Sequence, residues 1–463
     1  MTDGSDGTDT GSQPGRVEVA ARIRGELRLP GDKSIAHRAL LFDALGEGEA
    51  NVRIPSPGGD VQSTVGVLAA LGAVLEESRG TDGLMHYRVR GGGTASAACL
   101  PGVGGELLDH GNAGTSMRLS MGALAGRVAT ARQTGDASLS GRPMERVAMP
   151  LRAMGATVST VDGHAPVTIR GARPLIAMQH DLPVASAQVL GAVSLAALAA
   201  DGRTTITTTG PTRDHTERLL SWLGAPIRRD GLTTTVQGPV GFRARDIDVP
   251  GDISSAAFWL AAAALHPDAE LRIRAVGLNP SRTAIIDVLR EMGADITIAE
   301  SDPTGPEPVG DLVVRGGATI RGIRIDGARV ADLIDELPLL AIVMAAADGP
   351  SEVRDATELR HKESDRIALV VAGLRAIGVD ADELPDGWVV RPRAHRDDRP
   401  VAAPIVTHGD HRIAMAFAIA AVTGVADGVT IDDPACAEVS YPTFWTDLAQ
   451  LTNAGTVPAG AFR

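Results

Sequence analysis

One pattern recurs along the chain: an amphipathic helix, a glycine just past its last apolar turn, and then a β-prone segment. The copies read LAALGAVL, LRAMGATV, LSWLGAPI, LREMGADI and LRAIGVDA, and they begin at Leu68, Leu151, Leu220, Leu289 and Leu374. A glycine at this place is a common C-terminal cap of a helix. The segment YPTFWTDLAQLTNAG has the features of a worn sixth copy. Such repetition predicts a chain built from similar supersecondary units.

A second type of helix alternates with the first and is apolar almost all round. Its six copies are rich in small residues and read KSIAHRALLFDAL, GTSMRLSMGALAG, SAQVLGAVSLAALAA, DISSAAFWLAAAAL, LIDELPLLAIVMAAA and DHRIAMAFAIAAV. Helices without a polar face are usually buried. We therefore expect an α/β fold in which sheets enclose these helices, rather than a doubly wound parallel sheet. Six units divide as three plus three, and we place the division near Pro250–Gly251.

Length, charge and cysteine content limit the class of protein. A single core stops growing at about 250–300 residues, so 463 residues predict more than one domain. The formal net charge of −13 argues against a nucleic-acid partner. Two cysteines, Cys99 and Cys436, make no disulfide framework, which suits the cytoplasm. No uninterrupted apolar run is long enough for a membrane span, and residues 1–16 have nothing to bury and read as a disordered tail.

Positive charge gathers at the N-termini of the apolar helices. The cations in or beside first turns are Lys33, Arg38, Arg118 and Arg412. The helix dipole disfavours each cation there by about 0.3–1 kcal/mol. A bound anion would reverse this effect, because the free N–H groups of a helix start bind anions. The alternative is that these side chains extend into solvent or pair with Asp32 and Asp410.

Two further segments add cations. The segment ELRHKESDRIALVVAGL is expected to form a helix that carries Lys362 and Arg366 four residues apart on one face, with Glu363 between them. Arg142 and Arg213 precede other expected helices, in GRPMERV and TRDHTE. Arginine suits phosphate and carboxylate groups, while lysine is a compact cation. The pattern predicts one or two small ligands that carry several phosphate and carboxylate groups.

The remaining polar motifs favour proton transfer over metal or nucleotide chemistry. Asp335 and Glu363 supply carboxylates that can move protons when cations hold them. No motif of a P-loop, a dinucleotide fold, a zinc protease or a serine hydrolase is present. His408 and His411, in HGDHR, are spaced for a metal only weakly, and a satisfied or solvent-facing role is favoured. We expect no metal site.

Eight segments, in this order, carry a family resemblance: LPGDKSIAHR, GNAGTSMRL, GRPMERV, SAQV, TRDHTE, IDELPLLA, ELRHKESDR and DHRIAMAF. They resemble the signature segments of the EPSP synthase (3-phosphoshikimate 1-carboxyvinyltransferase) family and cover all but the two termini. The resemblance implies a two-domain inside-out α/β barrel, each domain made of three βαβαββ repeats. The expected boundaries are residues 1–16 for the tail, 17–31 plus 251–463 for one domain, and 32–250 for the other.

The resemblance also implies an activity. The family transfers the enolpyruvyl group of phosphoenolpyruvate to the 5-hydroxyl of shikimate 3-phosphate through a tetrahedral adduct and releases phosphate, on the route to chorismate and the aromatic amino acids. It implies that no metal and no organic cofactor is needed. The partners would then be two small molecules, with no nucleic acid and no membrane, and we expect a cytoplasmic monomer.

Roles for single residues follow from the same resemblance. Lys33 is expected to touch both substrates, Asp335 to accept the proton of the 5-hydroxyl, and Glu363 to exchange a proton at the methylene carbon. The residues expected to bind shikimate 3-phosphate are Lys33, Ser34, Arg38, Ser186, Ala187, Gln188, Arg213, Asp335 and Lys362. Those expected to bind phosphoenolpyruvate are Lys33, Gly114, Arg142, Gln188, Arg366 and Arg412.

A departure in the expected phosphoenolpyruvate pocket and three alternatives accompany the resemblance. Val439 stands where many bacterial members have a lysine, so one cation of the phosphoenolpyruvate pocket is absent. UDP-N-acetylglucosamine enolpyruvyl transferases share the architecture but use a loop cysteine or aspartate and begin with a Lys-Asn pair instead of Lys33–Ser34. A non-catalytic anion-binding relative is expected to lose Asp335, Glu363 or several arginines. An RNA-end-processing enzyme is disfavoured by the acidic charge.

Overall fold

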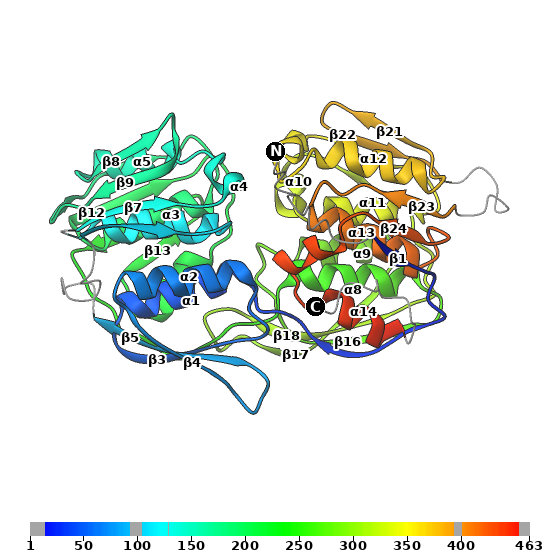
Figure 1. Ribbon diagram of the computed structural model, residues 1–463, viewed down its shortest axis with the longest axis horizontal. Coiled ribbons are helices and arrows are strands. Elements are labelled where there is room, and N and C mark those ends of the chain that lie inside the picture. The colour runs from blue at the N-terminus through cyan, green and yellow to red at the C-terminus, as the bar shows by residue number, and fades with distance from the viewer. Residues whose placement is uncertain (1–13, 93–103, 128, 393–400, 453–463) are drawn as a thin grey trace, which may run out of the picture.

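The computed structural model describes residues 14–92, 104–127, 129–392 and 401–452, which form two lobes side by side (Figure 1). Each lobe has its own hydrophobic core. One core draws on residues between Ile35 and Val249, and the other combines residues of 17–29 with residues of 253–451. The chain therefore crosses between the lobes twice. These cores support the domain boundaries 17–31 plus 251–463 and 32–250, which we retain as a proposal.

Among the described residues, six buried helices form the centres of the lobes, and the predicted fold class is confirmed. They are α1 (Lys33–Leu45), α3 (Gly114–Ala125) and α6 (Ala187–Ala197) in the first lobe, and α8 (Ile253–Leu265), α11 (Leu337–Ala345) and α13 (His411–Val422) in the second. Small residues let them approach closely. A Cβ on Gly122 of α3 would lie 2.1 Å from the carbonyl oxygen of Ala192 in α6, so only glycine fits there.

The other long helices bury one face each. They are α2 (Gly59–Ala70), α5 (Glu145–Ala153), α7 (His215–Trp222), α9 (Ala284–Glu291), α12 (Arg366–Ala376) and α14 (Phe444–Thr452). The short helices are α4 (Ala137–Ser140), α10 (Ala328–Leu333) and the 3₁₀ helices η2 (Thr357–His361) and η3 (Pro434–Val439). No helix within the described ranges has the length and apolar character needed to cross a membrane.

The strands are short and numerous. In the first lobe they are β3 (Glu47–Ile54), β4 (Val74–Arg79), β5 (Met85–Gly92), β6 (Gly104–Asp109), β7 (Thr130–Thr134), β8 (Thr157–Val161), β9 (His164–Arg170), β10 (Leu175–Ile176), β11 (Gln179–Asp181), β12 (Ala200–Thr207), β13 (Ile227–Asp230), β14 (Thr233–Gly238) and β15 (Ile247–Asp248). In the second they are β1 (Gly15–Val17), β2 (Ile23–Arg28), β16 (Ala269–Gly277), β17 (Asp295–Asp302), β18 (Val309–Arg315), β19 (Arg324–Ile325), β20 (Ser351–Val353), β21 (Ala381–Leu384), β22 (Gly387–Val390), β23 (Ala403–Ile405) and β24 (Val429–Ile431).

These strands make six sheets with a shared order. The sheets are β15-β3-β5-β4, β6-β7-β9-β8, β10-β12-β14-β13 with β11 also on β12, β2-β16-β18-β17, β19-β20-β22-β21 and β23-β24-β1. The first two strands of each sheet are parallel, and an antiparallel strand follows. In four of the sheets a buried helix connects the two parallel strands, because parallel strands need a crossover connection; these helices are α3, α6, α11 and α13. This is the βαβαββ repeat expected from the sequence.

Three of these sheets are completed by strands from distant parts of the chain. β15 pairs with β3, β2 with β16, and β1 with β24, where Gly15 lies opposite Ile431. The expected boundary of the disordered tail, residues 1–16, is therefore wrong at its C-terminal end. Gly15 and Arg16 belong to β1, because the sixth unit lacks a hairpin and its second strand pairs with β1 instead. Residues 1–13 lie outside the described residues, as does Cys99.

The two crossing segments share the sequence Pro-Gly-Asp-x-Ser, at residues 30–34 and 250–254. They are hydrogen-bonded to each other: the Asp32 N–H donates to the Pro250 carbonyl at 2.8 Å, and the Asp252 N–H donates to the Pro30 carbonyl at 2.9 Å. Each aspartate then caps a buried helix. Asp32 accepts from the N–H of Ile35 in α1, and Asp252 accepts from the second N–H of α8.

The expected helix through ELRHKESDR is wrong at its start. The 3₁₀ helix η2 ends at His361, and α12 begins only at Arg366. The carboxylate of Asp365 accepts from the Ala368 N–H at 3.1 Å, and this N-cap fixes the helix start. Lys362 has an extended backbone, so Lys362 and Arg366 do not share a helical face.

Asp43, near the end of α1, is a buried carboxyl in the core of the first lobe, and its ionisation allows the effect of this burial on stability to be measured. Its side chain is fully buried, and within the described residues its Oδ2 has no hydrogen-bond partner. Burial raises its pKa to about 7, against an ordinary value of 3.8. The folded state thus holds this proton more tightly than the unfolded state, so the carboxyl destabilises the fold increasingly as pH rises from about 4 to 7.

We expect Asp43→Asn to raise the free energy of unfolding, and to raise it by about 2–3 kcal/mol more at pH 8 than at pH 5. The asparagine stays neutral, as the protonated carboxyl does, while the wild-type carboxylate is charged at pH 8. Urea unfolding of both proteins at the two pH values measures the difference. A gain that is equal at pH 5 and pH 8 would contradict the burial argument.

Candidate active site between the two lobes

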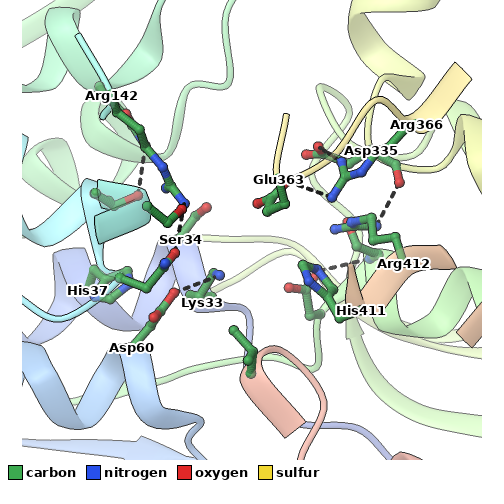
Figure 2. Close-up of a pocket in the computed structure, with 18 of the residues that line it drawn as sticks. Lys33, Ser34, His37, Asp60, Arg142, Asp335, Glu363, Arg366, His411 and Arg412 are labelled. Carbon is green, nitrogen blue, oxygen red and sulfur yellow. Dashed lines mark hydrogen bonds and ion pairs between the residues drawn. The ribbon is translucent and has the colours of Figure 1, made fainter. Parts of the chain in front are cut away.

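A cavity of about 430 Å³ lies between the lobes and takes side chains from both (Figure 2). All six buried helices begin at this cavity. In the order of the helices, its wall includes Lys33, Gly114, Gln188, Ser254, Asp335 and Arg412, each in the first turn or just before it. The first N–H groups of a helix have no partner within the helix, and they attract negative charge. Six such ends around one space favour an anionic ligand.

The first lobe contributes the start of α1. Lys33 is the first helical residue after the Asp32 cap, and its Nζ lies 2.8 Å from Oδ2 of Asp60 in α2. His37 lies one turn further along, and its Nδ1 is 2.7 Å from Oγ1 of Thr64. Burial lowers the pKa of His37 to about 3, so this side chain is neutral at pH 7. Lys33 therefore carries the positive charge here (Figure 2).

The start of α3 leaves room for two guanidinium groups. A Cβ on Gly114 would lie 3.1 Å from Nη1 of Arg118 and 3.3 Å from Nη1 of Arg142. Arg142 donates from Nη2 to Oδ1 of Asn112 at 2.7 Å, and Arg118 donates from Nη1 to Oε1 of Gln188 at 2.5 Å. Arg142 and Gln188 line the cavity, and Arg118 orients Gln188 from behind.

In the second lobe Asp335, just before α11, is surrounded by cations. Its Oδ2 accepts from Nη2 of Arg213 at 2.9 Å, and its Oδ1 is 3.5 Å from Nζ of Lys362. Burial raises the pKa of Asp335, but four cations together hold it well below its ordinary value; they are Arg412, Lys362, Arg213 and Arg366. Because Arg213 belongs to the first lobe, its ion pair with Asp335 spans the cavity.

Arg366 organises the neighbouring wall. Its side chain is almost completely buried; Nε donates to Oδ2 of Asp410 at 2.8 Å, and Nη2 donates to Oε2 of Glu363 at 2.7 Å. Asp410 caps α13 by accepting from the N–H of Arg412 at 2.9 Å. Burial raises the pKa of Glu363, but Arg366 and His411 lower it to a net value below the ordinary one. Glu363 is therefore ionised at pH 7 and fixed beside a cation.

The structure brings most of the predicted site residues to the cavity. The predicted convergence of Lys33, Arg142, Arg366 and Arg412 on one space is confirmed. The predicted residues that line it are Lys33, Ser34, Gly114, Arg142, Gln188, Arg213, Asp335, Glu363, Arg366 and Arg412. The alternative was that Lys33, Arg38, Arg118 or Arg412 pairs with Asp32 or Asp410. Among the described residues these carboxylates form ion pairs with other cations instead, Asp410 with Arg366 and Asp32 with Arg282.

Arg38, Ser186, Ala187 and Lys362 do not line the cavity in this structure. Arg38 is buried behind Ser34 and donates from Nη1 to the Ser34 carbonyl at 3.0 Å. Ser186 caps α6, and Ala187 is its first residue. Lys362 lies behind Asp335, with its Nζ 3.5 Å from a carboxylate oxygen of Asp335.

Several cavity residues were not selected from the sequence. They are His37, Asp60, Asn112, Thr115, Ser138, Asp252, Ser254, Arg282, His408, Gly409 and His411. For Asp252 and Ser254 a signal was available, since the Pro-Gly-Asp-x-Ser segment that contains Lys33 occurs again at 250–254. Val439, the departure from the family pattern, does lie at the cavity. Within the described residues no group of three His, Cys, Asp or Glu side chains is arranged to hold a metal ion.

Two lobes of three repeats each, with a cationic cavity between them, are the architecture of proteins with the enolpyruvyl transferase fold. The crystal structure of the enolpyruvyl transferase NikO from Streptomyces tendae matches with a TM-score of 0.72 over 95% of this chain and 98% of that chain. At 19% identity this match shows the fold alone.

The chain belongs to the EPSP synthase (3-phosphoshikimate 1-carboxyvinyltransferase) family, whose model matches residues 17–448. It is 44% identical to the 3-phosphoshikimate 1-carboxyvinyltransferase of Salinibacter ruber over 94% of this chain and 99% of that protein. The corresponding protein of Gloeobacter violaceus is 45% identical over 94% and 98%. The structure of an EPSP synthase from Acinetobacter baumannii matches with a TM-score of 0.83 and 37% identity, over 95% of this chain and 97% of that chain.

Proposed function

We propose that the chain transfers the enolpyruvyl group of phosphoenolpyruvate to the 5-hydroxyl of shikimate 3-phosphate and releases phosphate. One observation carries the proposal: two carboxylates, Asp335 and Glu363, lie among lysine and arginine side chains in a cavity at which six helices begin. Both substrates are polyanions that repel each other. A cationic cavity formed by two lobes offsets this repulsion and orients the reacting atoms, which is the main requirement of a two-substrate step.

We assign the substrates to two sides of the cavity. Shikimate 3-phosphate would contact Lys33, Ser34, Gln188, Arg213 and Asp335, with Arg38, Ser186, Ala187 and Lys362 behind them. Phosphoenolpyruvate would contact Lys33, Gly114, Arg142, Gln188, Arg366 and Arg412. Arginine binds planar carboxylate and phosphate with two parallel hydrogen bonds, which matches its abundance on the second side. Ser186 and Ala187 begin α6, so free backbone N–H groups there add to the first side.

Asp335 would take the proton of the attacking hydroxyl. In the free protein its four cations make it a weak base, because they hold its pKa low. Bound phosphate and carboxylate groups would neutralise those cations and so raise the proton affinity of Asp335 once both substrates are present. The base would then become effective only in the complete complex.

Glu363 would exchange a proton with the methylene carbon of phosphoenolpyruvate. In the addition step the hydroxyl oxygen bonds to C2 of phosphoenolpyruvate while the methylene carbon gains a proton, which gives a tetrahedral adduct. In the elimination step the new methyl group loses a proton, and the bond from C2 to the phosphate oxygen breaks. A carboxyl that gives this proton in the addition and takes one back in the elimination must lie near the substrate, and Glu363 lines the cavity beside Arg366. Glu363 is ionised in the free protein, so it would take up this proton as the substrates bind, when their anionic groups neutralise Arg366 and raise the proton affinity of Glu363.

Phosphate release from the purified full chain tests the proposal. We expect phosphate and 5-enolpyruvylshikimate 3-phosphate in equal amounts from phosphoenolpyruvate and shikimate 3-phosphate, with no added metal. We expect none when UDP-N-acetylglucosamine replaces shikimate 3-phosphate. Turnover with the uridine sugar alone would favour the related transferase class, while shikimate 3-phosphate binding without phosphate release would favour a non-catalytic relative.

We further propose that the protein works as a monomer in the cytoplasm. All six helix starts at the cavity come from one chain, so the site needs no second copy. Size-exclusion chromatography with light scattering at several concentrations tests the monomer. A stable dimer at low concentration would contradict it.

A further inference from the structure

Arg282 lies where the two crossings between the lobes meet. It precedes α9 in sequence, its side chain is only 6% exposed, and it lines the cavity at the crossing segments. Its Nη1 lies 3.6 Å from Oδ2 of Asp32, and its Nη2 lies 3.6 Å from Oδ1 of Asp252. One guanidinium group thus sits between the N-cap carboxylates of α1 and α8, the first buried helices of the two lobes.

The two carboxylates would repel each other without this cation. Asp32 is buried and the Asp252 side chain is 19% exposed, and each belongs to one copy of the Pro-Gly-Asp-x-Ser segment. Burial raises the pKa of Asp252, and the neighbouring Asp32 raises it further, whereas Arg282 opposes both effects. A planar guanidinium group can face two carboxylates at once from its two ends, and it loses less side-chain freedom in doing so than an ammonium group on a flexible chain.

Arg282 also reaches the start of α11. Its Nη2 donates to Oγ of Ser254 at 2.6 Å, and Ser254 in turn donates to Oε1 of Glu336. Glu336 follows Asp335 directly and lies 4.0 Å from both Arg282 and Arg412. The same side chain therefore contacts the helix start that carries Lys33 and the network beside Asp335.

We infer that Arg282 is a positioning residue that fixes the starts of α1, α8 and α11 relative to one another, and so sets Lys33 of one lobe against Asp335 of the other. The inference rests on the proposed function for its kinetic consequence. Arg282 acts through the caps of these helices, and its removal displaces catalytic groups of both lobes together. Misplacement of reacting groups lowers the rate of the chemical step more than it weakens ground-state binding.

The test compares Arg282→Gln, Arg282→Lys and the double variant Asp252→Asn/Arg282→Gln with the wild type. The double variant also removes the negative charge of Asp252, so that Asp32 is left without a repelling neighbour and the protein is expected to stay folded even if Arg282→Gln does not. Arg290→Gln is the matched control, because Arg290 lies in the adjacent helix α9, donates to the Ile296 carbonyl from Nε and Nη2, and is not among the described residues that line the cavity. Phosphate release gives kcat and KM, corrected for folded protein by circular dichroism.

A distance measurement makes the test independent of turnover. Spin labels on Met149→Cys in the first lobe and Ile298→Cys in the second report the lobe-to-lobe distance by pulsed electron resonance; both side chains are exposed. Cys99 is replaced by serine, and Cys436 is buried with a thiol pKa raised to about 12, so it reacts poorly.

We expect the two variants with Arg282→Gln to lose at least about 30-fold in kcat, with KM values within about 3-fold of the wild type. The kcat of Arg282→Lys should lie between those of the glutamine variants and the wild type. Arg290→Gln should keep the wild-type kcat and KM. The label distances should broaden in the glutamine variants only. A folded glutamine variant with wild-type label distances would overturn the inference, and so would wild-type kcat in an active enzyme. A wild-type protein without turnover would refute the proposed function instead, and the distances would still decide the role of Arg282.

Discussion

Lys33→Met lowers kcat/KM by at least about 1000-fold in the phosphate-release assay, which corresponds to roughly 4 kcal/mol of lost transition-state stabilisation. The physical reason is position: Lys33 is the first residue of α1, faces the cavity, and is the cation that would contact both substrates. A charge lost from a desolvated contact with an anion typically removes several kcal/mol. Methionine keeps the length of the side chain and removes only the ammonium group.

The variant should remain folded, which circular dichroism and thermal unfolding can check. Its Asp60 partner keeps a negative charge without Lys33, so we expect a small loss of stability rather than a gain. Arg24→Met is a suitable control. Arg24 lies in β2 and makes an exposed ion pair with Asp268, so its loss should leave turnover unchanged. Turnover of Lys33→Met within tenfold of wild type would refute the assignment of Lys33.

Asp335→Asn should reduce kcat by at least about 1000-fold while KM for both substrates stays the same or falls. The asparagine has the same shape but cannot accept the proton of the hydroxyl. Its four cationic neighbours lose the carboxylate that occupies them in the free protein, and they become more available to anions. Steady-state kinetics with each substrate varied in turn separates the two effects.

Inorganic phosphate provides an independent readout for the same variant. Without added anions Asp335→Asn should unfold at a lower temperature than the wild type, because repulsion among the cations is no longer offset. An anion that binds only the folded state stabilises it, so added phosphate should raise the unfolding temperature of the variant more than that of the wild type. An equal increase in the two proteins would show that Asp335 does not hold these cations.

Much of the fold could be predicted because the repeat is visible in the sequence. The apolar helices and the capping glycines mark each unit, and burial follows from the absence of a polar face on helices such as α8. The convergence of Lys33 and Arg412 could be predicted for a similar reason. Cations at helix starts are unfavourable unless an anion comes to them.

The parts of the fold and of the site that were not predicted depend on contacts between residues that are distant in sequence or on local capping. Lys362 and Arg366 have helical spacing, but the carboxylate of Asp365 caps α12 and ends the pattern between them. Arg282 lies in a loop without any charge pattern, and its partners Asp32 and Asp252 are remote from it in sequence. The β1 strand looked like part of a polar tail because its pairing partner, β24, lies at the other end of the chain.

The exchange of strands between sequence-distant segments affects how the protein can be made. The first lobe lacks β15 until its last residues have been synthesised, and the second lobe needs β1 and β2 from the opposite end of the chain. The strands that leave the ribosome first must therefore wait, unpaired, until β16 and β24 emerge. Contacts of such long sequence separation form slowly, so the leading segment of the nascent chain is the part most exposed to wrong pairing or to chaperones.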